Sequence, residues 1–343
     1  MAKVTFSRYL ELVRDPATSD ERILELSIVR RGKTAFAPEL VPDPSKVEMT
    51  AEEQELENAM AIGNSLARWR RGAAFLRRRA AGDPRPVLVA EGDSWFQFPI
   101  LIQETIDQLT DDYNIWCISA AGDTASNMVY GRPEYVAELK RFGPDVRGFL
   151  FSAAGNDILG NDAATGRSAL FDIVKPFNGQ PNDAEGQIDA AVLAERLDVL
   201  RRAYEDVIRN ARQALPAAAG GRPLPIFIHG YDYCFPYPWG ANDPRNPSYA
   251  ENDEWLGSVF EARGIAAAHG ELRRDIVARL IDALYSMLGQ LAADPAQTGV
   301  WLVDCRNAMP DVTDWADEIH GTSAGFAKVA ARFRQSLRSA GVD

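Results

Sequence analysis

The stretch VLVAEGDSWFQFP, residues 87–99, joins a short apolar run to a cluster of polar residues. Its first four residues, Val87 to Ala90, are apolar or small, which predicts a short buried strand. The polar residues Glu91-Gly92-Asp93-Ser94 then end that strand. Open α/β sheets hold their ligand crevices at the carboxyl ends of the strands, so we expect Ser94 at the mouth of such a crevice. The same residue types are also common in turns, and this stretch alone leaves both interpretations open.

Four further apolar runs follow the first one and predict four more strands. We expect these strands at 113–119, 146–152, 225–229 and 300–304, with helices at about 127–142, 190–215, 271–293 and 322–339. Short apolar strands that alternate with helices are typical of a parallel sheet covered on both faces. The sequence therefore predicts an α/β fold with a parallel five-stranded sheet.

Residues 1–83 differ in character from the rest and predict a helical N-terminal extension or appendage. Thr18 with Glu21, and Thr50 with Glu53, match the capping box that begins a helix. A long helix is expected over 51–80, and a Pro-rich connection at 38–44 separates the two helical runs. Residues 84–343 are expected to form the α/β domain, with insertions near 160–188 and 231–265.

Charge and cysteine content limit the possible partners and the compartment. The formal net charge of −12 argues against a nucleic-acid partner, because phosphate contacts need clustered Lys and Arg. The first residues lack the apolar core of a signal peptide, and we expect no membrane-spanning segment. Cys117, Cys234 and Cys305 cannot all pair within the chain and lack metal-ligand spacing, so we expect reduced thiols and a cytoplasmic protein.

Polar residues follow the predicted strands and provide the groups that acyl transfer requires. Ser94 is a candidate nucleophile, His320 a candidate base, and Asp317 a carboxylate able to orient the imidazole. The backbone N–H groups of Ser94 and Gly122 and the side-chain amide of Asn156 are candidate oxyanion donors. The sequence therefore predicts that these five residues meet in one pocket.

These blocks resemble the SGNH or GDSL hydrolases. The matching blocks are GDS with Ser94, AGDT with Gly122, GND with Asn156, and DxxH with Asp317 and His320, in the family's order along about residues 86–331. The resemblance implies a flavodoxin-like three-layer α/β/α sandwich. It also implies a serine nucleophile completed by the histidine and aspartate, an oxyanion hole from the serine amide, the glycine amide and the asparagine, and no cofactor or metal.

Three features depart from the family pattern or imitate another one. Trp95 follows the nucleophile where leucine is usual, and Ala154 stands where the third block usually has its first glycine. The segment 321–325 matches the G-x-S-x-G pattern of α/β-hydrolases around Ser323, but no histidine follows it, as that pattern requires. We therefore interpret Thr322 or Ser323 as the cap of the last helix.

Substrate contacts are expected from Trp95 and from the aromatic loop at 231–239. Tyr231, Tyr233 and Trp239 are candidates for the wall of an apolar cleft, and His229 is a further candidate at the same edge of the sheet. The alternative is that the loop packs as a small core and that His229 is a hydrogen-bonded structural residue. The sequence leaves both interpretations open.

The leading hypothesis is a serine hydrolase that cleaves carboxylic esters through an acyl-enzyme. One alternative is an acyltransferase that uses the same three residues, and another is a non-catalytic binding module on the same fold. The expected substrate is a small-molecule or polymeric ester. The sequence does not specify the acyl group, the oligomeric state, the role of residues 1–83 or whether the insertions form a lid.

Overall fold

A parallel five-stranded sheet forms the centre of the protein. The structure is a computed structural model that describes residues 3–15, 17–30, 39–49, 63–98, 102–160, 165–218, 221–245 and 255–343. The strands of the sheet are β5 (Val87–Gly92), β6 (Asn114–Cys117), β7 (Val146–Ser152), β8 (Ile226–His229) and β9 (Val300–Val303). Their order is β6-β5-β7-β8-β9, which is the 2-1-3-4-5 order of flavodoxin-like folds. The predicted fold class is confirmed.

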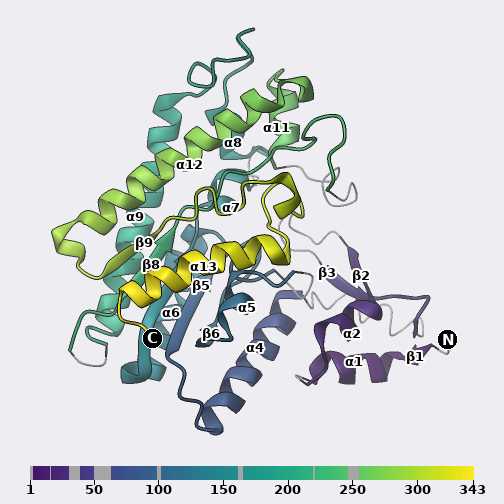
Figure 1. The fold of residues 1–343 in the computed structure, drawn as a ribbon, viewed down its shortest axis with the longest axis vertical. Coiled ribbons are helices and arrows are strands. Elements are labelled where there is room, and N and C mark those ends of the chain that lie inside the picture. Colours follow the sequence, from purple (N-terminus) through teal and green to yellow (C-terminus); the bar gives the residue numbers. More distant parts are fainter. Residues whose placement is uncertain are drawn as a thin grey trace.

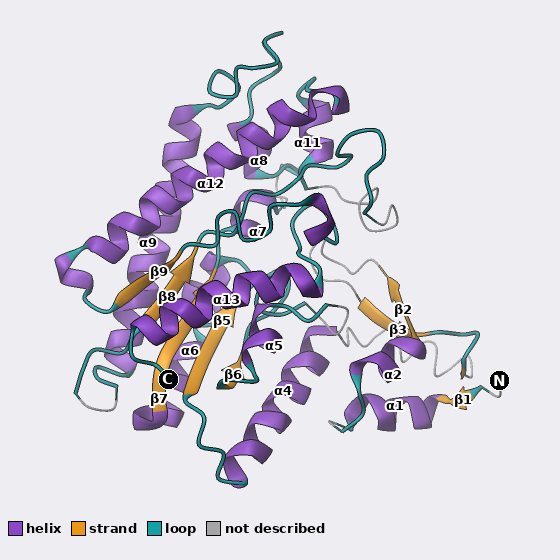
Figure 2. Ribbon diagram, viewed as in Figure 1, coloured by secondary structure: helices purple, strands orange, loops and turns teal. Residues whose placement is uncertain are grey.

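Helices cover both faces of this sheet (Figures 1 and 2). On one face α6 (Glu134–Phe142), α9 (Ala190–Ala214) and α12 (Gly270–Ala293) pack side by side. On the other face α13 (Ser323–Ser339) packs against α5 (Thr105–Leu109), and Figure 1 shows α13 crossing in front of the strands. The helix α4 (Gly63–Ala80) packs beside the edge strand β6. The strands are buried between these layers, and every residue of β5 is buried.

Shorter elements connect the main helices and strands. The helix expected over 127–142 is divided into a π-helical turn, η1 (Asn127–Gly131), and α6, because Pro133 interrupts it. The remaining connecting elements are η2 (Gly143–Asp145), α7 (Gly155–Leu159), α8 (Ala169–Ile173), α11 (Gly257–Ala262), η3 (Ala267–His269), η4 (Pro295–Gln297) and η5 (Val312–Asp314).

The helix α12 lies within a stretch, Ala267–Ala293, that is long and apolar enough to cross a membrane. This differs from the expectation that no such segment exists. In the structure α12 packs against α9, β8 and β9, and nine of its residues are buried. Core helices of globular proteins share this composition, and here apolar side chains of α12 pack against the sheet and α9.

The N-terminal segment forms a small unit of its own beside α4. It holds β1 (Val4–Thr5), α1 (Phe6–Arg14), α2 (Asp20–Glu25), β2 (Ser27–Arg30), β3 (Glu39–Pro42) and β4 (Val47–Glu48). Phe6, Tyr9 and Ile23 are among the residues of its separate small core. The Arg70 guanidinium of α4 donates to the carbonyl oxygens of Val13 and Asp15 and thereby joins the unit to the sandwich.

The structure of this segment differs in detail from the expectation of an all-helical extension. β3 lies within the Pro-rich stretch expected to be a connection, and it pairs with β2 in an antiparallel ladder. Ser19 rather than Thr18 caps α2. Within the described residues α4 continues through Gly72, whereas the first part of the long helix expected over 51–80, with Thr50 and Glu53, lies outside the described residues.

Candidate active site

Ser94 lies in a tight turn directly after β5. The Asp93 carboxylate holds this turn, because its Oδ1 accepts the backbone N–H of Trp95 at 3.1 Å and the Ser152 hydroxyl at 2.9 Å. Glycine is required at position 92, since a Cβ there would lie 2.7 Å from the Cβ of Ser152 on the neighbouring strand. The close approach of β5 and β7 therefore fixes where Ser94 stands.

The structure brings Ser94, His320 and Asp317 into one chain of hydrogen bonds. His320 Nε2 lies 2.8 Å from Ser94 Oγ, and His320 Nδ1 lies 2.7 Å from Asp317 Oδ2. A carboxylate can only accept, so Nδ1 carries the hydrogen and Nε2 is left to accept the hydroxyl proton. All three side chains are buried, with His320 fully so. This is the geometry in which a histidine can activate a serine hydroxyl.

Backbone contacts fix the loop that carries His320. The other oxygen of Asp317, Oδ1, accepts the backbone N–H groups of Ile319 at 2.9 Å and His320 at 2.7 Å. The indole Nε1–H of Trp95 donates to the carbonyl oxygen of Ile319 at 2.9 Å. The residue after the serine thus holds the histidine loop directly, which is a structural reason for tryptophan at position 95.

Two aromatic rings cover the imidazole of His320. The ring centre of Phe98 lies 4.5 Å from that of His320, and the ring centre of Trp255 lies 5.4 Å away. Both come from loops beside the sheet edge, and neither was singled out in the sequence. Their apolar rings exclude water from the imidazole and strengthen the electrostatic interaction between His320 and Asp317.

Of the three expected oxyanion donors, Ser94 and Gly122 lie in turns after strands, and Asn156 lies in the first turn of α7. Gly122 has a φ of 86°, which glycine adopts without strain. The Asn156 side chain is buried, and its Nδ2 donates to the carbonyl oxygen of Asp123 at 2.6 Å. A carboxamide nitrogen carries two hydrogens, so this bond orients the amide and leaves the second hydrogen available. Among the described residues no backbone oxygen accepts the N–H of Ser94 or Gly122.

The third block begins with an alanine in a backbone conformation that favours glycine. Ala154 adopts a φ of 111°, a conformation that residues other than glycine rarely adopt. Gly155 follows, and its backbone N–H donates to the Tyr231 hydroxyl at 2.9 Å. The Asp157 carboxylate accepts the backbone N–H of Ala125 at 2.9 Å, which ties the second block to the third.

A buried network behind Ser94 joins the ends of three strands. The Tyr231 hydroxyl donates to Asp93 Oδ2 at 2.5 Å, and Ser152 donates to the other oxygen of the same carboxylate. His229 Nε2 lies 2.9 Å from Ser152 Oγ, and His229 Nδ1 accepts the backbone N–H of Tyr231 at 3.2 Å. His229 is therefore the Nε2–H tautomer, and the network closes on itself.

Burial shifts the pKa values within this network. Loss of solvent raises the pKa of Asp93 to about 6, although the donors from Tyr231, Trp95 and Ser152 act in the opposite direction. Burial lowers the pKa of His229 to about 3, so its imidazole is neutral near pH 7. With His229 neutral, the direction of each hydrogen bond between His229, Ser152 and Asp93 is defined, and this network supports the turn that carries Ser94.

Glu318, between Asp317 and His320, holds the outer loops against the site. Its carboxylate accepts the backbone N–H groups of Tyr237 at 2.7 Å, Leu256 at 2.8 Å and Gly257 at 2.7 Å. Burial raises the pKa of Glu318 to about 7, while these three N–H donors favour its charged form. Glu318 could not be singled out from the sequence, because its partners are distant backbone groups that leave no local pattern.

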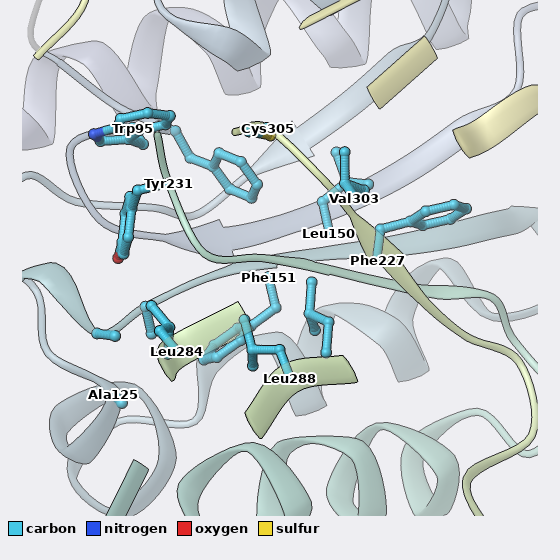
Figure 3. Close-up of a cluster of buried hydrophobic side chains, with 14 of the residues drawn as sticks. Trp95, Ala125, Leu150, Phe151, Phe227, Tyr231, Leu284, Leu288, Val303 and Cys305 are labelled. Carbon is cyan, nitrogen blue, oxygen red and sulfur yellow. The ribbon is translucent and has the colours of Figure 1, made fainter. Parts of the chain in front are cut away.

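An apolar cavity of about 100 Å³ opens beside Ser94. Asp93, Ser94, Asn156 and Tyr231 lie at its polar end, and Trp95 forms part of the wall. The rest of the wall is mostly aliphatic and comes from α7, α8, α9 and α12. Figure 3 shows Trp95, Tyr231 and Leu284 in this part of the core. Trp95 and Tyr231 were expected in the wall of an apolar cleft, but the helical leucines were not, since leucines spaced along helices indicate ordinary core packing.

The candidate substrate residues separate into two groups. Trp95 and Tyr231 line the cavity. His229 is fully buried and packs against the rings of Phe96 and Phe333, which corresponds to its structural interpretation. Tyr233 donates to Asp282 at 2.7 Å, and Trp239 packs on Phe235 and borders a different surface hollow. Tyr233 and Trp239 are therefore not brought to the cavity.

The described residues contain no group of three or more His, Cys, Asp or Glu side chains that could hold a metal ion. Cys117, Cys234 and Cys305 are free and buried. The pattern G-x-S-x-G is explained by helix capping, because Thr322 caps α13 and accepts the backbone N–H of Gly325 at 3.0 Å.

The fold and the site together define a flavodoxin-like α/β/α sandwich with a serine, a histidine and an aspartate in hydrogen-bond contact at the carboxyl edge of its sheet. A scan against protein-family models found no match, and a search of curated proteins found none. Solved structures do resemble the chain. One is a lipase from a goat rumen metagenome, with 14% identity over 75% of this chain and 97% of that chain and a TM-score of 0.44.

Two further solved structures are named as esterases. A carbohydrate acetylesterase family member from Sinorhizobium meliloti shares 12% identity over 75% of this chain and 99% of that chain, with a TM-score of 0.38. An inhibitor-bound aryl esterase from M. smegmatis shares 15% identity over 74% of this chain and 98% of that chain, with a TM-score of 0.38. These structures are reported as similar in fold alone, and the flavodoxin-like fold of this chain rests on its own strand order and helix layers.

Proposed function

We propose that this protein is a serine hydrolase that cleaves carboxylic esters through an acyl-enzyme intermediate. The observation that carries the proposal is the continuous contact from Ser94 Oγ to His320 Nε2 at 2.8 Å and from His320 Nδ1 to Asp317 at 2.7 Å. A binding module has no need of this alignment in a buried site. The proposal further draws on three candidate oxyanion donors, of which Ser94 and Asn156 line the same cavity and Gly122 is the third.

In the first half of the reaction Ser94 Oγ attacks the ester carbonyl carbon while its proton passes to His320 Nε2. The carbonyl π electrons move to oxygen, and the N–H groups of Ser94, Gly122 and Asn156 stabilise that oxyanion. The carbonyl then re-forms and the carbon–oxygen bond to the leaving alcohol breaks. The alcohol oxygen takes the proton from His320, and Asp317 stabilises the imidazolium in between.

In the second half water replaces the alcohol. His320 takes a proton from water, the hydroxide oxygen bonds to the acyl carbon, and the second tetrahedral oxyanion occupies the same three donors. Collapse of this intermediate breaks the bond to Ser94 Oγ, which recovers its proton from His320. The products are a carboxylic acid and an alcohol, and the enzyme returns to its starting state.

Hydrolysis of a p-nitrophenyl ester series by Ser94→Ala and Ser323→Ala tests this proposal. Ser323 is the serine of the G-x-S-x-G pattern and serves as the matched control, because it begins α13 and accepts the backbone N–H of Gln103 at 3.0 Å. We expect Ser94→Ala to lose about 10⁴-fold or more of kcat, since removal of a triad serine leaves only the oxyanion contribution. Ser323→Ala should keep kcat within about twofold.

Two results would overturn the proposal. One is a Ser94→Ala variant, shown by circular dichroism to be folded, that retains wild-type esterase activity. The other is wild-type protein that hydrolyses none of the esters. With added alcohols as acceptors, release of the acid alone is expected, whereas transfer of most acyl groups to the alcohol would identify an acyltransferase.

A further inference from the structure

The cavity beside Ser94 is apolar along its length, and only its end at Ser94 is polar. Its walls away from that end include Leu193 and Leu197 of α9 together with Leu280 and Ile281 of α12. Protein interiors are close-packed, and an apolar void lowers stability because its walls lose contacts. A ligand that fills this void would restore the lost contacts, so a void next to a candidate nucleophile is explained if it binds part of the substrate. Apolar cavities of this order of size accept hydrocarbon ligands.

The position of the cavity assigns it to one side of the ester. The leaving alcohol must take its proton from His320 Nε2, so it departs on the imidazole side. Ser94, Asn156 and Ile319 line the cavity, whereas the described side chains of Asp317 and His320 do not. The cavity therefore opens from the nucleophile and an oxyanion donor, away from the proton donor. That is the side on which the acyl group lies while it is bonded to Ser94.

The lining residues on two helices limit how long a chain the cavity can hold. Leu193 to Leu200 on α9 and Val277 to Leu284 on α12 are each eight residues of helix, and the seven steps between their ends rise about 10 Å at 1.5 Å per residue. An extended hydrocarbon chain advances roughly 1.3 Å per carbon, given single bonds of about 1.5 Å in a zigzag. The two estimates give an upper limit of about eight carbons for a chain that lies along these helices.

We propose that this cavity binds the acyl chain, and that the substrates are esters of medium-length unbranched aliphatic acids rather than acetyl esters. This proposal rests on the proposed esterase function and adds the substrate class. Among the described residues no charged side chain lines the cavity beyond the end near Ser94, so the acyl chain is recognised by burial of methylene groups. A polar or sugar-bearing acyl group would leave its hydroxyl groups without partners there.

The first test varies only the acyl chain. Wild-type kcat/KM is measured for p-nitrophenyl esters with acyl chains of two to sixteen carbons, all with the same leaving group. Each buried methylene contributes about fourfold at most, so we expect kcat/KM to rise about two- to fourfold per carbon up to roughly eight carbons and then to level off or fall. An acetyl ester hydrolysed as well as an octanoyl ester would overturn the acyl-chain proposal but leave the esterase proposal intact.

The second test narrows the cavity without touching the reacting groups. Leu197→Phe places a larger side chain in the wall, whereas Val199→Phe, two residues further along α9, adds the same ring at a position that is 48% exposed. We expect Leu197→Phe to lower kcat/KM for the octanoyl ester at least tenfold, with less than a threefold change for the acetyl ester. Val199→Phe should match the wild type on both esters. Equal losses on both esters in folded Leu197→Phe would contradict the proposal.

A binding measurement separates this proposal from the esterase proposal. Calorimetric titration of Ser94→Ala with octanoate needs no turnover. We expect binding with a negative heat-capacity change, at least tenfold weaker in Ser94→Ala/Leu197→Phe and unchanged in Ser94→Ala/Val199→Phe. If octanoate binds but wild-type protein has no esterase activity, the cavity assignment stands and the esterase proposal is refuted. Absence of octanoate binding in every variant would refute the cavity assignment.

Discussion

His320 Nε2 lies 2.8 Å from Ser94 Oγ, although the two residues are 226 positions apart in the chain. The contact depends on the parallel sheet, which places the turn after β5 and the loop after β9 at the same edge. Trp95 reinforces it, because its indole bonds the carbonyl oxygen of Ile319 next to the histidine. Local contacts around each partner therefore fix the distance between the hydroxyl and the imidazole.

Asp317→Asn should strongly impair turnover. The carboxylate accepts from His320 Nδ1, and a carboxamide in its place can present N–H₂ to that nitrogen and favour the wrong tautomer. We expect kcat to fall by about 10³- to 10⁴-fold, with a smaller change in KM. Steady-state kinetics on a p-nitrophenyl ester would measure this. A folded variant within tenfold of wild-type kcat would rule out Asp317 as the residue that orients the imidazole.

Asn156→Ala and Asn127→Ala form a matched pair. Both amides donate to Asp123, Asn156 to its backbone oxygen and Asn127 to its carboxylate, each at 2.6 Å, but Asn127 is exposed and lies outside the cavity wall. Removal of one oxyanion donor costs about 10²- to 10³-fold in kcat, and we expect this loss for Asn156→Ala alone. Equal activities of the two variants would exclude Asn156 from the oxyanion hole.

Asp93 should make the protein less stable as the pH rises through the acid range. Its pKa is about 6 in the folded protein, against 3.8 for an unperturbed aspartic acid, so between these values the folded state holds a proton that the unfolded state has lost. Stability therefore falls with rising pH. Asp93→Asn removes this contribution, and we expect its free energy of unfolding, relative to wild type, to rise by about 2 kcal/mol from pH 4.5 to 7.5. Urea unfolding at the two pH values would measure this.

His229→Gln is the control for Asp93→Asn, because the two residues change the free energy of unfolding in opposite directions as the pH rises. The pKa of His229 is about 3 in the folded protein, against 6.5 for an unperturbed histidine, so the unfolded state binds the extra proton and stability rises with pH between these values. The free energy of unfolding of His229→Gln, relative to wild type, should therefore fall over the same pH range. A difference that does not change with pH for either variant would refute the charge assignments in the network.

Gly92→Ala should destabilise the fold at the β5–β7 contact. A Cβ would lie 2.7 Å from the Ser152 Cβ and 2.9 Å from the Ser152 carbonyl oxygen, so a strand must shift. We expect a loss of about 1–3 kcal/mol in the free energy of unfolding, together with reduced activity as Ser94 moves. In Gly289→Ala on α12 the nearest atom, of Leu302, is 3.7 Å away, and this variant should be neutral or slightly stabilised. Equal effects would contradict the close-contact argument.

The sequence allowed the sheet to be predicted to within about two residues at each strand. Buried parallel strands are nearly continuous apolar runs, and β7 was predicted with the bounds it has, Val146–Ser152. The polar blocks were predictable for the same reason, because each one interrupts an apolar run. Because Ser94, Asn156 and His320 each follow a predicted parallel strand, their place in the sequence was sufficient to predict that they lie at one edge of the sheet.

Other features could not be predicted because no local pattern distinguishes them. The network of Asp93, Ser152, His229 and Tyr231 joins the ends of three strands, and its members look like ordinary strand-end residues. The leucines that line the cavity have the spacing of any core helix. Whether such side chains meet or leave a void depends on how α9 and α12 are placed on the sheet, which the sequence pattern does not specify.

Intact-mass spectrometry after reaction with a fluorophosphonate is the most direct test of the central claim that His320 activates Ser94. Wild-type protein should gain the mass of a single phosphonyl group, located by peptide mapping on Ser94, and Ser323→Ala should be labelled at the same rate. Ser94→Ala should remain unlabelled, and His320→Ala should react at least 10³-fold more slowly because its hydroxyl lacks a base. Labelling of a different serine in wild-type protein, or of Ser94 at the same rate without His320, would contradict the account.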